Sequence, residues 1–550
     1  MKIIIKTIKQ CPRGDSLDEK GQGAFRLKIV GVWLLILFIG LAVRARAGNW
    51  LTFGHDPQRT GWARGEDTLS VKNVSHLELK WKVQLKNQPL SLTALTAPLV
   101  ATHVTTPQGV KTLVYVAGSS DHVFALDANT GKLVWSVTFH SPVVPKNPGM
   151  WLCPNNLNAT PTIDRRAGLI YVLGADGRLY GLGLGTGRIK FGPIQFVPPY
   201  TKDWSLNLVH GIIYTSVSQD CSETQSGIYA MDVRHPMRPV IRDLLVAKRG
   251  GAGIWGRGGV TAGEGTRIYA ATGDGPNDPA VGEYGSSVIA VKIPKLKVVD
   301  YYSPNDYELL TRYDLDVGAS SPAWFAHGKY HLLAAGGKGG TLYLLNADRL
   351  GSGDHQTPLE TLRLANDERA YEENGIWGGF ATWRDAQGET WLYVPVWGPI
   401  SKNAPKFPLA HGPAPDGCLM AFRVGANVRT HRPELVPAWV SRDFNRPEPP
   451  VVANGVVFGL STGENPQQTQ GAAVVAKPGH YGNRILTNQE RMANTRHAVL
   501  YALDARTGKV LYNSGDTMTS WVHFSGLAVA NGRVYAVDHD SQVYCFGLKK

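Results

Sequence analysis

Two short motifs in this chain have the residue spacing of known enzymatic sites. Gly459-Leu-Ser461-Thr-Gly463 matches the nucleophile elbow, in which a sharp turn between a strand and a helix exposes a serine hydroxyl. Residues 251–256 (GAGIWG) match the glycine spacing of a dinucleotide-binding loop, which also needs a preceding strand and a following helix. Neither motif is followed by a helical pattern. We therefore expect neither nucleophilic catalysis nor dinucleotide binding at these positions.

The spacing of cysteines and histidines excludes the common metal and haem motifs. The five cysteines are scattered, without the CxxC pairs of a zinc ribbon or the CxxCH of attached haem, and the sixteen histidines include no HExxH. Cys153 with Cys221 is the candidate disulfide, which an exported protein could form. Buried free thiols are the alternative.

The elements that must position any site form an eightfold repeat. Each unit has an apolar strand, a polar turn and a second apolar strand. A unit of this size cannot bury its apolar face alone, so neighbouring units must stack. Eight units in a ring predict an all-β, eight-bladed β-propeller, with function expected in the loops around its central axis. The first strands centre on Tyr115, Tyr171, Tyr214, Tyr269, Leu333, Tyr393, Phe458 and Tyr535.

The two ends of the repeat predict how the ring closes. The eighth unit reaches residue 550 without an outer strand, whereas residues 77–85 alternate like a strand but have no partners nearby in the sequence. We predict that this N-terminal strand pairs with the C-terminal blade, which places Trp81 beside Tyr544. Such pairing removes the exposed edges that an open array of sheets would have.

The N-terminus has the pattern of an export signal. Residues 29–43 form an uncharged run of 15 residues after Arg26 and Lys28, and Ala45-Arg46-Ala47 resembles a cleavage site. The run is shorter than the roughly 20 residues of a bilayer span. We predict a leader and signal peptide at 1–47, a single propeller at 48–550, and a periplasmic or secreted protein. An uncleaved signal would instead anchor the protein to the membrane.

The charge gives no support for a nucleic-acid partner. The formal net charge is +13, and residues 1–47 contribute nearly half of it through nine basic and three acidic residues. The remaining excess is spread over the propeller without a dense basic run. We therefore expect an ordinary solvated surface and no nucleic-acid binding.

The strand–turn signature resembles the repeat of the pyrroloquinoline quinone (PQQ) propeller superfamily. One copy reads Ala502-Leu-Asp504-Ala-Arg-Thr507-Gly508-Lys and is followed by Tyr512. The resemblance covers nearly all of residues 49–550. The superfamily includes quinoprotein alcohol dehydrogenases, which hold PQQ and calcium on the propeller axis, and non-enzymatic outer-membrane assembly lipoproteins. The repeat is specific for the fold but weak evidence for a function.

The resemblance implies ligands for both the metal and the quinone. Asp274 stands where the dehydrogenases have an asparagine that binds calcium, and an aspartate offers the same hard oxygen. Glu223 lies roughly where the family has a second calcium ligand. Trp255 matches the indole under the quinone plane, and Lys338 matches a basic residue that contacts the quinone.

The resemblance also implies a catalytic base. The stretch Tyr313-Asp314-Leu-Asp316 matches the segment that carries it, with Asp316 the better placed. Calcium would polarise the quinone carbonyl, the carboxylate would take the alcohol proton, and hydride would pass to the quinone. The implied function is PQQ- and Ca²⁺-dependent oxidation of a small alcohol or sugar, with a separate electron acceptor.

A propeller without a cofactor is the alternative function. The dehydrogenases have adjacent cysteines that form a disulfide over the cofactor, and this chain has no Cys-Cys pair. The site residues also have structural explanations: core packing for Trp255, an Asx turn for Asp274, a structural hydrogen bond for Asp316, and solvated positions for Glu223 and Lys338. A protein-binding or envelope-assembly scaffold therefore stays open, as does a sensor or carbohydrate-binding propeller.

Overall fold

The computed structural model describes residues 48–90, 92–149, 152–368, 374–467, 470 and 486–549. The chain divides into two compact units, Met1–Arg46 and Ala47–Lys550, and all of the described residues belong to the second. The predicted leader and signal peptide lie outside the described residues. Among the described residues, no helix has the length and apolar character needed to cross a bilayer.

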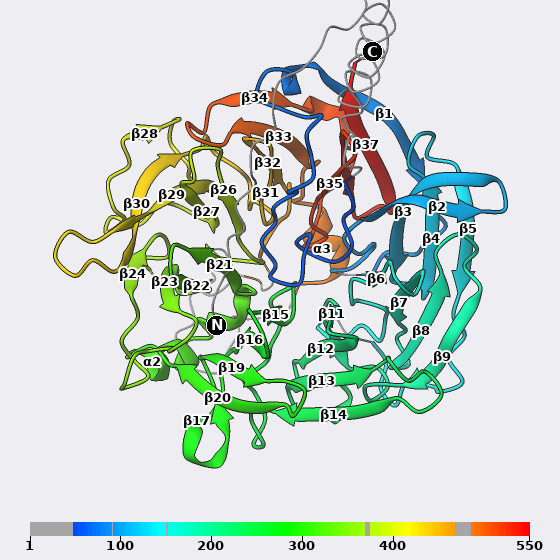
Figure 1. Cartoon of the computed structure of the whole chain (residues 1–550), viewed down its shortest axis with the longest axis horizontal. Coiled ribbons are helices and arrows are strands. Elements are labelled where there is room, and N and C mark those ends of the chain that lie inside the picture. Colours follow the sequence, from blue (N-terminus) through cyan, green and yellow to red (C-terminus); the bar gives the residue numbers. More distant parts are fainter. Residues whose placement is uncertain are drawn as a thin grey trace, which may run out of the picture. The chain divides into compact units, whose positions relative to one another are not determined.

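Eight antiparallel sheets surround a central axis, so the predicted all-β, eight-bladed propeller is confirmed (Figure 1). We number the blades in chain order, and each has its first strand nearest the axis. The first four blades contain β2 (Leu99–Thr106), β3 (Gly109–Gly118), β4 (His122–Asp127) and β5 (Leu133–Thr138); β6 (Thr162–Asp164), β7 (Leu169–Leu173), β8 (Arg178–Gly183) and β9 (Ile189–Gln195); β10 (Lys202–Asp203), β11 (Asn207–Val209), β12 (Ile212–Ser218), β13 (Gly227–Asp232) and β14 (Val240–Leu245); and β15 (Thr261–Ala262), β16 (Arg267–Ala271), β19 (Val288–Lys292) and β20 (Lys297–Tyr302).

The second half of the ring repeats this arrangement. Blades five to eight contain β21 (Ala323–His327), β22 (Tyr330–Gly336), β23 (Thr341–Asn346) and β24 (Glu360–Arg363); β25 (Gly375–Ile376), β26 (Ala381–Arg384), β27 (Thr390–Trp397), β28 (Leu409–Ala410), β29 (Gly417–Ala426) and β30 (Pro433–Val440); β31 (Val451–Ala453), β32 (Val456–Ser461), β33 (Val499–Asp504) and β34 (Val510–Asn513); and β35 (Ala528–Ala530), β36 (Arg533–Val537), β37 (Gln542–Leu548) and β1 (Leu77–Gln84).

Short elements interrupt the loops between the strands. A two-stranded ribbon extends from blade four, and the helices are single turns or little more. These elements are β17 (Asn277–Asp278) and β18 (Glu283–Tyr284), α2 (Tyr307–Arg312) and α3 (Asn488–Met492), and the 3-10 turns η1 (Val74–His76), η2 (Cys221–Glu223), η3 (Pro279–Val281), η4 (Val317–Ala319) and η5 (Gly515–Thr517).

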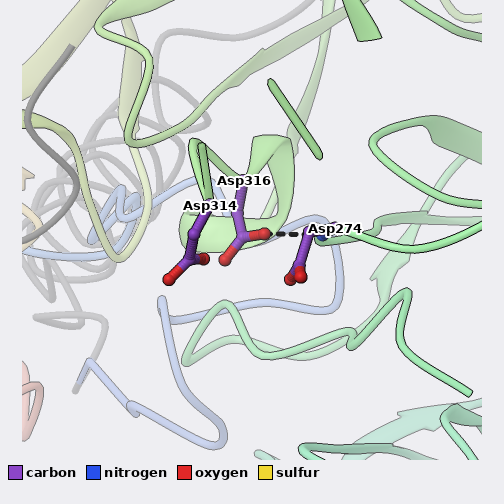
Figure 2. Close-up of side chains that lie close together, drawn as sticks. All are labelled: Asp274, Asp314 and Asp316. Atoms are coloured by element: carbon purple, nitrogen blue, oxygen red, sulfur yellow. Dashed lines mark hydrogen bonds between the residues drawn. The ribbon is translucent and has the colours of Figure 1, made fainter. Parts of the chain in front are cut away.

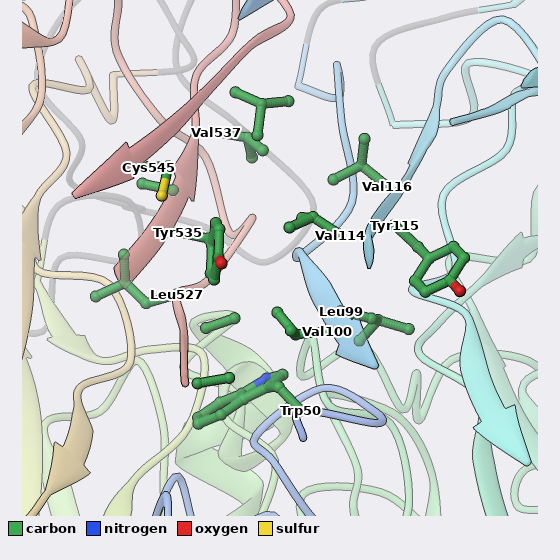
Figure 3. Packing of buried hydrophobic residues seen from close by; sticks show 14 of the residues in the cluster. Trp50, Leu99, Val100, Val114, Tyr115, Val116, Leu527, Tyr535, Val537 and Cys545 are labelled. Carbon is green, nitrogen blue, oxygen red and sulfur yellow. The ribbon is translucent and has the colours of Figure 1, made fainter. Parts of the chain in front are cut away.

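The ring closes where the N-terminal strand joins the last blade. β1 pairs antiparallel with β37, with Trp81 opposite Cys545 and Lys82 opposite Tyr544. Apolar side chains then fill the space between blades eight and one, where Tyr535 and Val114 belong to one continuous cluster (Figure 3). Residues from the two ends of the described chain therefore share one core.

Tryptophans on outer strands pack on glycines of the following blade. Trp135 of blade one covers Gly187, where an added Cβ would lie 2.6 Å from the indole, and its Nε1 donates to the Leu184 carbonyl oxygen at 2.8 Å. Trp439 covers Gly508 in the same way, again with 2.6 Å to an added Cβ. Gly508 ends an Asp-x-x-Thr-Gly turn, and Gly187 ends a copy in which Gly183 replaces the aspartate, so the Thr-Gly end of the turn lies where adjacent blades meet.

A segment before β1 passes every blade in order around the axis. We call residues 50–66 the axial segment. It hydrogen-bonds to Val100, Ile163, Leu206, Ala262, Trp324, Thr382, Val452 and Gly532, which belong to blades one to eight. Most of these bonds use backbone carbonyls of the segment, such as that of Leu51, which accepts from the Ile163 N–H at 2.8 Å. The eight blades are thus tied together on their inner side as well as at the β1–β37 junction.

Candidate functional site

Three aspartates meet beside the axis between blades four and five (Figure 2). Asp274 follows β16, while Asp314 and Asp316 lie between α2 and η4. Each offers a carboxylate oxygen, and these three oxygens lie within 4.8 Å of one another. We call Asp274, Asp314 and Asp316 the carboxylate cluster. Oxygen donors of this kind are suited to hard cations such as Ca²⁺.

Asp316 is the centre of the cluster's hydrogen bonds. Its Oδ1 accepts the Asp274 backbone N–H at 2.6 Å, and its Oδ2 accepts the Trp255 indole N–H at 3.0 Å. Lys338, in the turn between β22 and β23, places its Nζ 3.0 Å from Asp316 Oδ2 and 2.6 Å from Asp314 Oδ1. One ammonium therefore bridges two of the three carboxylates.

Glycines allow the backbone to close around Asp316. A Cβ added to Gly273 would lie 2.8 Å from Asp316 Oδ1, and one added to Gly337 would lie 1.7 Å from the Asp316 carbonyl oxygen. A Cβ on Gly318 would meet the Gly273 nitrogen at 2.8 Å. Any side chain at these positions would force the carboxylate or its backbone to move. The glycines after β16, in η4 and after β22 thus set the geometry of the cluster.

The three carboxyl groups have well-separated pKa values. Burial and the neighbouring charge of Asp316 raise the pKa of Asp274 to about 9. Burial raises the pKa of Asp314 to about 7, although Lys338 opposes the rise. Burial alone would raise the pKa of Asp316, but the Lys338 ammonium outweighs it and the pKa is lowered. Near neutral pH, Asp316 is therefore ionised, Asp274 is protonated, and Asp314 is close to its midpoint.

Aromatic rings line the axis next to the cluster. The partly exposed indole of Trp255 lies with its centroid 5.4 Å from that of Trp377, and Lys338 Nζ lies 5.1 Å from the Trp255 centroid. Trp377 stacks on Trp397 at 4.8 Å and lies 6.0 Å from Phe524. The arrangement provides a flat apolar face beside charged groups. A planar acid such as a quinone with carboxylates fits these features, because the indole can stack and Lys338 can bind an oxygen.

The structure brings together most of the predicted site residues, but not Glu223. Asp316 contacts each of Asp274, Trp255 and Lys338, as described above. Glu223 lies in η2 with its side chain 83% exposed, and the cation near it is Lys146 at 3.8 Å. Its turn is held by the Cys153–Cys221 disulfide, which confirms the candidate pairing. Asp314 stands in the cluster where the resemblance had suggested Glu223.

A second buried group of charges was not predicted from the sequence. Glu464 Oε1 lies 2.7 Å from His523 Nδ1 and 3.2 Å from Arg491 Nη2. Arg257 donates to the His523 carbonyl oxygen at 3.3 Å, and Glu448 accepts the Ser525 N–H at 3.1 Å. These residues lie in long loops without a recognisable motif. In the sequence, the nearest indication of this group was the position of Arg257, two residues after the predicted site residue Trp255.

The comparisons with known proteins agree with the fold. Residues 50–192 match the family model for the β-propeller domain of glucose, ethanol and alcohol dehydrogenases (PQQ). The quinohemoprotein alcohol dehydrogenase of Comamonas testosteroni is 30% identical over 144 residues, which are 26% of this chain and 18% of that protein. In sequence, the chain thus matches less than a fifth of this relative's length.

Solved structures extend the likeness to most of the chain. The crystal structure of the Comamonas testosteroni enzyme has a TM-score of 0.53 and 16% identity, and the match covers 93% of this chain and 82% of that one. A europium-containing methanol dehydrogenase has a TM-score of 0.53 and 14% identity, and the match covers 93% of this chain and 91% of that one. At such identities the likeness shows the fold alone. The family match itself is confined to residues 50–192, about a quarter of the chain.

Proposed function

We propose that this protein is an exported quinoprotein dehydrogenase that oxidises a small alcohol or sugar with PQQ and a hard cation. The observation that carries the proposal is the carboxylate cluster, which lies against Lys338 and the face of Trp255 on the axis. Asp274 and Asp316 of the carboxylate cluster would hold the cation, while Trp255 and Lys338 would hold the quinone. When bound, these groups supply a Lewis acid and a two-electron acceptor. Electrons then require a separate acceptor protein.

The proton acceptor is better placed at Asp314 than at Asp316. Both oxygens of Asp316 accept hydrogen bonds, and the residue is only 2% exposed. Asp314 uses Oδ1 for Lys338, and its side chain is 19% exposed, so that Oδ2 is available to a substrate hydroxyl. We propose that Asp314 Oδ2 accepts the substrate proton and that Asp316 orients Lys338 and Trp255. The assignment of the base to Asp316, made from the resemblance, stays a competing prediction.

Ligand titration with the full chain tests the proposed function. Ca²⁺ and Eu³⁺ are added first, and the europium probe is chosen because a structural neighbour is described as europium-containing. PQQ is then added, and its binding is followed by its absorbance. Oxidation of a panel of alcohols and sugars is measured with a dye as the electron acceptor. We expect cation and quinone binding, with Glu223→Gln as an unaffected control because Glu223 lies outside the cluster. If neither cation nor quinone binds, the proposal fails and the scaffold function is favoured.

Two further variants separate the roles of the aspartates. Asp314→Asn should bind cation and quinone but oxidise substrate about 100-fold or more slowly, which is the usual effect of removing a general base. Asp316→Asn should weaken cation and quinone binding, because it loses the charge that holds Lys338. The reverse result, with binding intact in Asp316→Asn and lost in Asp314→Asn, would return the base to Asp316.

A further inference from the structure

A cavity on the propeller axis has no role in the proposed reaction. It lies between the axial segment and the start of the inner strands of blades five to eight, with about 400 Å³ of unfilled space including its opening to solvent. Its lining includes Trp50, Phe53, Arg59, Ser321 and Phe380. None of its lining residues is acidic, and none belongs to the carboxylate cluster.

Arg59 brings a positive charge to this cavity, whose lining contains no carboxylate. The residue is 3% exposed, and its Nη1 donates to Thr52 Oγ1 and to the Phe53 carbonyl oxygen, each at 2.8 Å. Its Nη2 donates to the Leu206 carbonyl oxygen at 3.1 Å, and within the described residues its Nε has no partner. The neighbouring Asp56 carboxylate instead pairs with Arg64. The hydrogen-bond acceptors of the guanidinium are therefore neutral, and the Asp56 charge acts on it without a hydrogen bond between the two side chains in the described residues.

Two other donors in the cavity wall also lack partners. Trp50 is fully buried and Ser321 is 3% exposed, yet in the described part of the chain neither Trp50 Nε1 nor Ser321 Oγ has a hydrogen-bond partner. Figure 3 shows the Trp50 indole beside Val100. Buried polar atoms are nearly always hydrogen-bonded, so three such atoms on residues that line one cavity point to a ligand there.

We propose that this axial cavity binds a small monovalent anion, either a halide or a carboxylate of the size of formate or acetate. The anion would accept from Arg59 Nε, Trp50 Nε1 and Ser321 Oγ. Water could satisfy the donors, but an anion would also offset the guanidinium charge, because Arg59 shares the Asp56 carboxylate with Arg64. The rings of Phe53 and Phe380 limit the space for larger polar ligands. The site is thus distinct from any cation or quinone site.

Anion-dependent stability tests the proposal. A ligand that binds only the folded state raises the unfolding midpoint as its concentration increases. We would titrate the full chain with chloride, formate or acetate against gluconate, a bulky anion, at constant ionic strength. We expect saturable stabilisation by chloride or by the small carboxylates, and none by gluconate. Stabilisation by chloride identifies the halide as the ligand class, and stabilisation by formate or acetate alone identifies the carboxylate.

Matched variants separate binding from general destabilisation. Arg59→Gln should weaken the apparent anion affinity at least about tenfold, since hydrogen bonds to charged groups are the stronger ones. Trp50→Phe keeps the ring but removes the donor, and should weaken the affinity by a smaller factor. Arg257→Gln is the control, because Arg257 is also buried on the axis but does not line the cavity.

A direct measurement completes the test. Bromide replaces chloride in crystals, and its anomalous signal should appear within hydrogen-bonding reach of Arg59 Nε. Water alone in the cavity, together with equal anion sensitivity of the wild type and Arg59→Gln, would overturn the proposal. Equal loss of sensitivity in Arg59→Gln and Arg257→Gln would also overturn it.

Discussion

Replacing Glu448 by glutamine should stabilise the protein at alkaline pH. Glu448 is 1% exposed and accepts the Ser525 N–H through Oε1, while Oε2 has no partner within the described residues. Burial raises its pKa from 4.5 to about 7, although Arg257 opposes the rise. Glutamine has the same shape and can still accept this hydrogen bond, but it carries no charge to bury.

The sign and size of the effect follow from the two pKa values. Between pH 4.5 and about 7, folded Glu448 retains a proton that the unfolded chain releases. The stabilisation that Glu448 gives to the folded state is therefore fully present below pH 4.5 and is lost as the pH rises through about 7. The difference between the pKa values corresponds to about 3 kcal/mol. At pH 8, the free energy of unfolding of Glu448→Gln should exceed that of the wild type by up to that amount. Near pH 4 the two proteins should have the same free energy of unfolding.

Denaturant unfolding followed by tryptophan fluorescence measures this difference. The wild type, Glu448→Gln and the exposed-site control Glu308→Gln would be compared at pH 4, 6 and 8. The control should follow the wild type at every pH. If the free energies of unfolding of Glu448→Gln and the wild type changed with pH in parallel, the reasoning would be refuted, because ionising Glu448 would then have no cost in the folded state.

Two further predictions concern the cluster and the disulfide. Gly273→Ala should lower cation affinity about 10- to 100-fold in calorimetry, as loss of support around metal ligands does, because its Cβ would lie 2.8 Å from Asp316 Oδ1. Gly48→Ala, with no atom nearer than 3.4 Å to its Cβ, is the control, and equal affinities would contradict the argument. Replacing Cys153 and Cys221 by serine removes a link across 68 residues and should cost about 4 kcal/mol of unfolding free energy. A loss below about 1 kcal/mol would show that the unfolded loop is already constrained.

The sequence predicted the parts of the fold that repeat. Tyr115 and its seven counterparts mark strands at regular intervals, and the Asp-x-x-Thr-Gly turns mark where one blade meets the next. The pairing of residues 77–85 with the last blade followed from an unpaired strand at each end. The axial segment was not predicted, because its contacts are mostly single backbone carbonyls, one per blade. Such contacts impose no pattern on the side chains.

The site was predicted in part, for a related reason. Asp274, Asp316 and Lys338 follow inner strands or lead into them, so the ring geometry brings them to the axis. Glu223 lies beyond the end of a strand, where a disulfide and left-handed backbone angles turn it outward. Arg59 was not singled out because nothing in the sequence indicates which buried donors will lack acceptors. Spacing along the chain predicts position, but the direction of a loop depends on contacts between distant residues.

The axial segment also bears on the order of assembly. During synthesis residues 50–66 emerge before any blade, yet their last partner along the chain, Gly532, belongs to the eighth blade. The segment therefore cannot complete its contacts until the eighth blade has been made. Folding of this domain should consequently end, rather than begin, at its amino-terminal side, and a nascent chain stalled before the eighth blade should remain accessible to proteases there.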